Sequence, residues 1–125
     1  MAQASVLRRD LPPEIPDDVD DPAVEKAHGV VTLPRWIDWS SDDPTYDLSD
    51  RWQRIRVYEQ VLREGTADDV RYFIDVDVLL DLWDELILPP AVSSAWITWL
   101  AQHRHVTVRD CRDRAREQFA ASQAR

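Results

Sequence analysis

Several residue types are scarce in this chain of 125 residues, and each shortage narrows what the protein can be. Cys111 is the only cysteine, so an intrachain disulfide is impossible and a reducing, cytoplasmic location is expected. There are two glycines, and neither lies in a phosphate-binding pattern. No apolar run approaches the roughly 20 residues of a membrane helix. Residues 1–16 lack the apolar core of a secretory signal, so we expect no membrane association.

Lysine is also scarce, because Lys26 is the only one among 15 basic residues. The chain has 24 acidic residues and a net charge of -9, which is spread unevenly. Residues 1–50 carry 12 acidic against 4 basic residues, whereas residues 101–125 carry 3 against 6. Such acidity repels nucleic acid and anionic membranes over most of the surface. It favours a basic protein partner, or it simply keeps the chain soluble.

Residues 1–27 are predicted to form an extended or disordered acidic arm rather than a packed element. Prolines interrupt any helix there, and neighbouring carboxylates repel one another. Apolar residues nevertheless recur every few positions, as in a strand that fills successive pockets on a partner. The candidate partner-binding residues are Val6, Leu7, Leu11, Ile15, Asp17, Asp18, Val19, Asp20, Asp21 and Val24. The alternative is a disordered tail that contacts nothing.

Residues 28–47 are predicted to form a short edge strand, a hairpin or an extended strap on the helices. Residues 30–33 are strand-prone, while Pro34 excludes a central position in a sheet. Trp36 and Trp39 are expected to anchor this strap in the core. The alternative is a base-stacking platform, but such platforms come with a basic groove and the surroundings here are acidic.

Two helices are predicted directly after the strap. The first covers about residues 50–64, with Ser49 as its N-cap and Trp52 on its buried face. Gly65 is expected to end it in the left-handed conformation. Thr66 and Asp69 then have the spacing of a capping box for a second, shorter helix.

Three further helices are predicted downstream, over about 77–87, 91–103 and 108–123. Ile87 is expected to be buried in the first, Pro90 to begin the second and Thr107 to cap the third. The fold class is therefore mainly α. We expect a compact bundle of four to five short helices in a single domain over residues 28–125, preceded by the acidic, proline-rich arm.

Catalytic and metal chemistry have little support in the sequence. Asp75 and Asp77 form a D-x-D pair that could hold Mg²⁺, but a phosphate cradle is missing, and a solvated helix face explains them better. His103, His105 and Cys111 match no recognised zinc spacing. We expect no catalytic residue, no metal and no cofactor.

A small DNA-associated transcriptional regulator is the alternative function. The predicted helices at 67–73 and 77–87 are spaced like a helix-turn-helix, but the second is acidic and lacks base-reading residues. Nucleic acid is therefore expected only at the last helix, where Arg109, Arg112 and Arg116 would contact phosphate.

The strings VYEQVLREGTADDVRYFID (Val57–Asp75) and LLDLWDELILPPAVSSAWITWL (Leu79–Leu100) resemble a family of small acidic actinobacterial proteins of uncharacterised function. Some members are encoded beside a toxin gene, as antitoxin-like partners. The resemblance covers about a third of the chain and brings no catalytic motif. It implies a non-catalytic antitoxin or inhibitor that neutralises a basic partner, such as a toxin enzyme acting on RNA or nucleotides. An acidic arm with regular apolar anchors, beside a helical core, suits that role.

Overall fold

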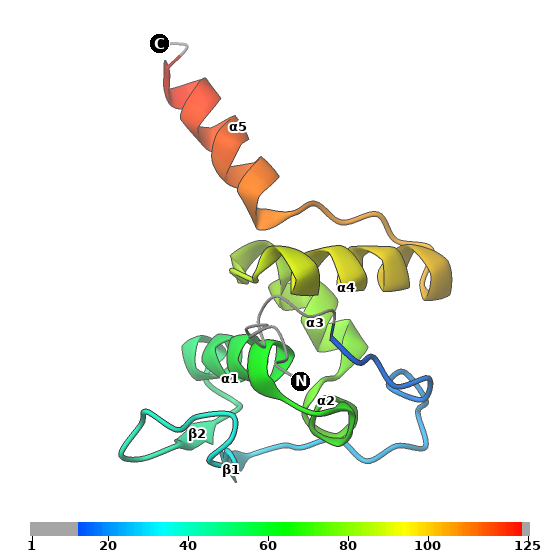
Figure 1. Ribbon diagram of the computed structural model, residues 1–125, viewed down its shortest axis with the longest axis vertical. Coiled ribbons are helices and arrows are strands. Elements are labelled where there is room, and N and C mark those ends of the chain that lie inside the picture. Colours follow the sequence, from blue (N-terminus) through cyan, green and yellow to red (C-terminus); the bar gives the residue numbers. More distant parts are fainter. Residues whose placement is uncertain (1–12, 124–125) are drawn as a thin grey trace, which may run out of the picture.

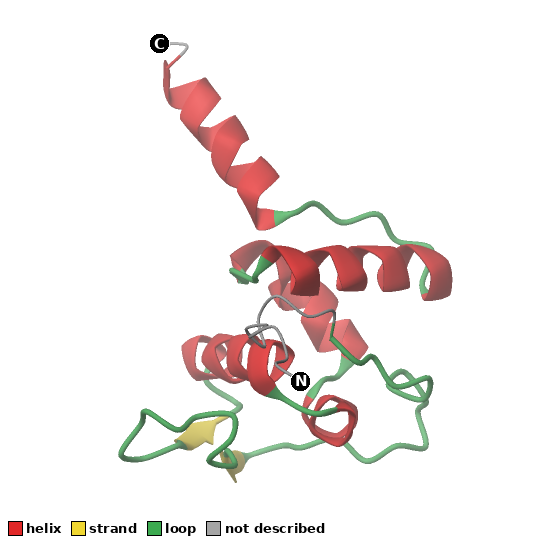
Figure 2. Cartoon of the chain, in the orientation of Figure 1, coloured by secondary structure: helices red, strands yellow, loops and turns green. Residues whose placement is uncertain are grey.

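The computed structural model of the chain describes residues 13–123, and these residues are mainly helical, as predicted (Figures 1 and 2). The predicted anchors Val6, Leu7 and Leu11 lie outside the described residues. The elements are β1 (Val30–Thr32), β2 (Thr45–Asp47), α1 (Arg51–Glu64), α2 (Ala67–Phe73), α3 (Val76–Leu82), the 3-10 turn η2 (Trp83–Glu85), α4 (Pro90–His103) and α5 (Cys111–Gln123).

The ends of α1 and α2 confirm one predicted capping motif and correct two other predictions. Thr66 and Asp69 form the predicted capping box, each side chain accepting from the other's backbone N–H. The N-cap of α1 is Asp50, not Ser49, because the Asp50 carboxylate accepts from the N–H of Gln53. Gly65 is extended (φ -76°) rather than left-handed. Glycine is needed there because a Cβ would lie 2.6 Å from the carbonyl oxygen of Val61.

The third predicted helix is shorter than expected. The Asp75 side chain caps α3, and the helix tightens into η2 and then becomes extended at Leu86. The expectation that Ile87 is buried is therefore wrong: its side chain is 73% exposed, and its N–H donates to the carboxylate of Glu59.

The last two helices start near the predicted positions. Pro90 is the first residue of α4, as predicted. α5 begins at Cys111 rather than at 108, and Thr107 does not cap it. The Asp110 carboxylate accepts from the N–H of Arg112 and takes the role expected of Thr107.

The buried apolar residues of the described chain form one cluster between α1, α2, α3 and α4. α4 lies across one side of this group, and α5 projects beyond it (Figure 1). α5 contributes no buried residue within Cys111–Gln123. The core is therefore built by the first four helices, with additions from the two segments that precede them.

β1 and β2 form a two-stranded antiparallel sheet in which Val31 is opposite Tyr46. In the connection between them, a tight turn begins at Pro34, whose carbonyl oxygen accepts from two following N–H groups. This turn directs Ile37 and Asp38 inward and leaves Trp36 and Trp39 exposed. The expectation that Trp36 and Trp39 anchor the strap in the core is therefore wrong, because Ile37 and Leu33 do so.

Candidate protein-interaction surface

The described part of the predicted arm, residues 13–27, lies on this chain's own helices. Val19 is fully buried and belongs to the core cluster, and Pro16 is buried beside it. The N–H of Ala27 donates to the carbonyl oxygen of Tyr72 at the end of α2 (2.9 Å). Val19, expected to enter a pocket on a partner, therefore fills a pocket in its own protein.

Lys26 explains why this acidic segment packs. Its Nζ donates to the carbonyl oxygens of Val19 and Arg71, each at 2.6 Å. Burial lowers the pKa of Lys26, and the carboxylates of Asp75 and Asp18 oppose that shift. One ammonium group thus joins the middle of the segment, its C-terminal part and α2.

Two of the four predicted partner-binding aspartates are also engaged internally. Asp18 pairs with Arg71 (2.8 Å), and Asp20 pairs with Arg104 (3.1 Å). The hydrogen bond from Arg71 holds the pKa of Asp18 below its ordinary value. Asp17 and Asp21 are exposed and have no ion pair within residues 13–123. These two carboxylates stay available to a partner.

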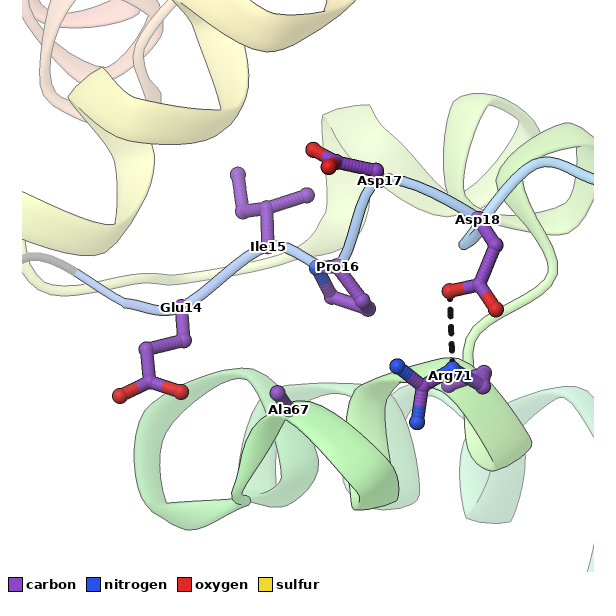
Figure 3. A pocket seen from close by; sticks show the side chains of 7 residues that line it. All are labelled: Glu14, Ile15, Pro16, Asp17, Asp18, Ala67 and Arg71. Carbon is purple, nitrogen blue, oxygen red and sulfur yellow. Dashed lines mark hydrogen bonds and ion pairs between the residues drawn. The ribbon is translucent and has the colours of Figure 1, made fainter.

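An open groove of about 550 Å³ separates this segment from α2. Figure 3 shows Glu14 and Asp18 pointing towards α2 and Asp17 pointing away from it. Arg71, the one basic side chain along the groove, pairs with both Asp18 and Asp68. The groove therefore carries an excess of negative charge, and a cationic side chain would complement it.

Three of the six tryptophans are largely exposed: Trp36 by 60%, Trp39 by 79% and Trp52 by 74%. Trp36 donates its indole N–H to the carboxylate of Asp69 (2.8 Å), which holds the ring at the start of α2. Trp39 lines a shallow groove with Arg63 and other residues of α1. Trp52 lies in the first turn of α1, and the prediction that it is buried is wrong.

These tryptophans were missed as surface residues because helical spacing and hydrophobicity both favour burial. The signal that could have identified two of them is their immediate surroundings. Trp36 follows Arg35 and Trp39 precedes Ser40, in a segment beginning at a proline. Such a segment turns too sharply to bury both rings.

The three arginines predicted to contact phosphate each have a carboxylate partner in this chain. Arg109 pairs with Glu117, Arg112 with Asp110 and Arg116 with Asp113. These pairs reduce the positive charge that α5 offers to an anion.

Both carboxylates of the D-x-D pair, Asp75 and Asp77, already interact with groups of this chain. Asp75 caps α3, and Asp77 pairs with Arg104. Across residues 13–123, no group of three or more His, Cys, Asp or Glu side chains is placed to hold a metal ion. None of the helices in the same stretch is long and apolar enough to cross a membrane.

Comparisons with known proteins place no relative beside this chain: no family model, no curated protein and no solved structure matches it. The resemblance to antitoxin-like proteins accordingly stays a prediction.

Proposed function

We propose that this protein is a non-catalytic binding module of the inhibitor or antitoxin type, which neutralises a basic partner enzyme. The observation that supports this most is the exposure of Trp36, Trp39 and Trp52. Large apolar side chains on a surface mark interaction sites, and tryptophan is enriched among the residues that dominate binding energy.

The energetic argument concerns what these rings gain when a partner covers them. A tryptophan side chain buries about 150–250 Å² in an interface. At about 25 cal/mol per Å², each ring contributes on the order of 4 kcal/mol before the costs of association. Three such rings would supply a large part of the binding free energy of a complex, and none of them belongs to the buried core.

The sign of the partner's charge follows from the exposed carboxylates of this chain. Asp42 and Asp43 are exposed on the loop that carries Trp36 and Trp39. Glu14, Asp17 and Asp21 are exposed on the packed segment 13–27. A basic protein would be attracted to these carboxylates at low ionic strength.

Fewer of the predicted partner-binding residues are free to contact a partner in the folded chain. Val19 is unavailable because it is in the core, and Asp18 and Asp20 are already paired. Binding would therefore use the surface of a folded segment rather than an arm that wraps the partner. No observation favours the DNA-associated alternative, since its three arginines are paired.

A capture experiment with matched variants tests the proposal. The full chain, the variant Trp36→Ser/Trp39→Ser/Trp52→Ser and the control Thr98→Ala, at an exposed position on α4, are immobilised side by side. Each is exposed to nuclease-treated lysate of the native host. A basic protein held by the full chain and the control is then purified, and its affinity for each variant is measured.

We expect the triple variant to bind that protein at least 100-fold more weakly, because truncating interface tryptophans commonly costs 2 kcal/mol or more each. Affinity for the full chain should also fall as salt is raised. Equal affinity of the triple variant and the full chain, with both folded by circular dichroism, would contradict the proposal.

A further inference from the structure

A second cavity, of about 270 Å³, lies away from the exposed tryptophans. It is a partly open pocket where the link between segment 13–27 and β1 meets α1 and the start of α3. The side chains used below are His28, Leu48, Arg54, Tyr58, Asp75 and Val78. Residues distant in sequence thus converge on one small space.

Two hydrogen-bond donors on α1 line this cavity. Arg54 and Tyr58 are four residues apart and so share a helix face. The Nε of Arg54 is buried and has no hydrogen-bond partner. Arg54 also forms no ion pair within residues 13–123, although Arg51 and Arg71 each form two.

Tyr58 is the second donor. Its side chain is only 3% exposed, and its oxygen accepts from the N–H of Asp75 at 3.0 Å. Burial raises the pKa of Tyr58 to about 12, so the hydroxyl keeps its proton at neutral pH. Among the described residues, that proton has no acceptor. A buried donor without an acceptor is costly, which points to an acceptor supplied from outside the chain.

The charges facing the cavity favour an anion over a cation. Asp75 is the only carboxylate along its wall, and its oxygen already accepts from the N–H groups of Asp77 and Val78. The ammonium group of Lys26 interacts electrostatically with Asp75 from the neighbouring segment. Lys26 also interacts with Asp18 and Asp20, so it adds no excess of positive charge here. Arg54 is the charged group on the wall whose Nε lacks a partner, and an anion would supply one.

We propose that this cavity binds a monocarboxylate. Its two oxygens would accept from the guanidinium group of Arg54 and the hydroxyl of Tyr58, in a charge-assisted arrangement. The rest of the molecule would lie against Leu48 and Val78. The volume equals that of about nine water molecules, which limits the ligand to a small acid or the end of a chain. The carboxylate could thus come from a free metabolite or from the C-terminus of a polypeptide.

Protein-observed NMR of the full chain tests this. Acetate, propionate, N-acetylalanine and N-acetylalanine amide are titrated separately, each against chloride at matched ionic strength. We expect saturable shifts of the Gly29 and Asp75 amide signals with the carboxylates, at a Kd of about a millimolar for ligands this small. The amide should produce none.

Variants assign the effect to the two donors. Arg54→Met should weaken binding at least tenfold and Tyr58→Phe several-fold, whereas Trp39→Ser, outside the cavity, should bind as the wild type does.

Saturation by acetate supports a free acid, and saturation by N-acetylalanine alone supports a chain terminus. The proposal is overturned if no carboxylate saturates by about 50 mM, if the amide binds equally, or if folded Arg54→Met binds as tightly. If Arg54→Met fails to fold, the comparison of N-acetylalanine with its amide on the wild-type protein still tests the proposal. The result is independent of the tryptophan surface.

Discussion

Residues 13–27 and the loop over residues 33–44 differ in which side chains they bury. The first segment is rich in carboxylates and offers few large apolar groups, yet it is packed, with Val19 fully buried. The second carries two tryptophans and exposes both. Lys26 and the pairs Asp18–Arg71 and Asp20–Arg104 connect the first segment to α2 and to the end of α4. Packing here follows the positions of polar anchors as much as the size of apolar side chains.

Within residues 13–27, the largest expected effect comes from removing the ammonium group of Lys26. Lys26→Met keeps the apolar stem but leaves the carbonyl oxygens of Val19 and Arg71 without their donor. We expect the free energy of unfolding to fall by about 2–3 kcal/mol, measured by urea denaturation. The control Arg35→Met, at an exposed position, should stay within about 0.5 kcal/mol of wild type. An unchanged midpoint for Lys26→Met would show that the segment is held by other contacts.

Removing the buried apolar side chain of the same segment should cost slightly less. Val19→Ala deletes two methyl groups from a fully buried position and is expected to lower the free energy of unfolding by about 2 kcal/mol. Val30→Ala, the same change at an exposed residue of β1, should cost less than about 0.5 kcal/mol. Similar losses for the two variants in urea denaturation would mean that Val19 is not in the core.

Acid should weaken the packed segment through Asp18. Because Arg71 lowers the pKa of Asp18, the folded protein binds this proton less tightly than the unfolded chain. The contribution to stability is therefore present above the ordinary pKa of 3.8 and is lost as pH falls through the lower folded value. Urea midpoints measured from about pH 6 to about pH 2.5 should fall less for Asp18→Asn than for wild type. Asp17→Asn, which removes an unpaired carboxylate, should follow the wild-type profile, and identical profiles for all three would refute the role of the pair.

The smallest effect is expected at the exposed rings. Trp39→Ser and Trp52→Ser should each change the free energy of unfolding by less than about 0.5 kcal/mol, because the side chains are more than 70% exposed. Trp96→Ser, at a fully buried ring, is expected to prevent folding. Thermal unfolding followed by circular dichroism distinguishes these cases. A loss of several degrees from either exposed site would place that ring in the core.

Local signals predicted most of the helices. The capping box of Thr66 and Asp69 and the start of α4 at Pro90 depend on residues within one turn, so a single sequence contains all that decides them. The end of α3 was missed because Leu86 and Ile87 continue a helical pattern that the chain leaves in order to reach α4. Of the predicted partner-binding residues, Asp17 and Asp21 are exposed and Val19 is buried, and their role in binding stays a prediction.

The amino-acid sequence by itself determined the mainly helical class, the approximate positions of the helices and the acidity of the surface, because these depend on neighbours and on composition. Only the tertiary structure decided which apolar residues are inside. The bond from Lys26 to Arg71 spans 45 positions, and the cavity beside Arg54 and Tyr58 gathers residues from 27 to 78. Such contacts depend on the final arrangement of the helices, so no local pattern could assign Val19 to the core or Trp39 to the surface.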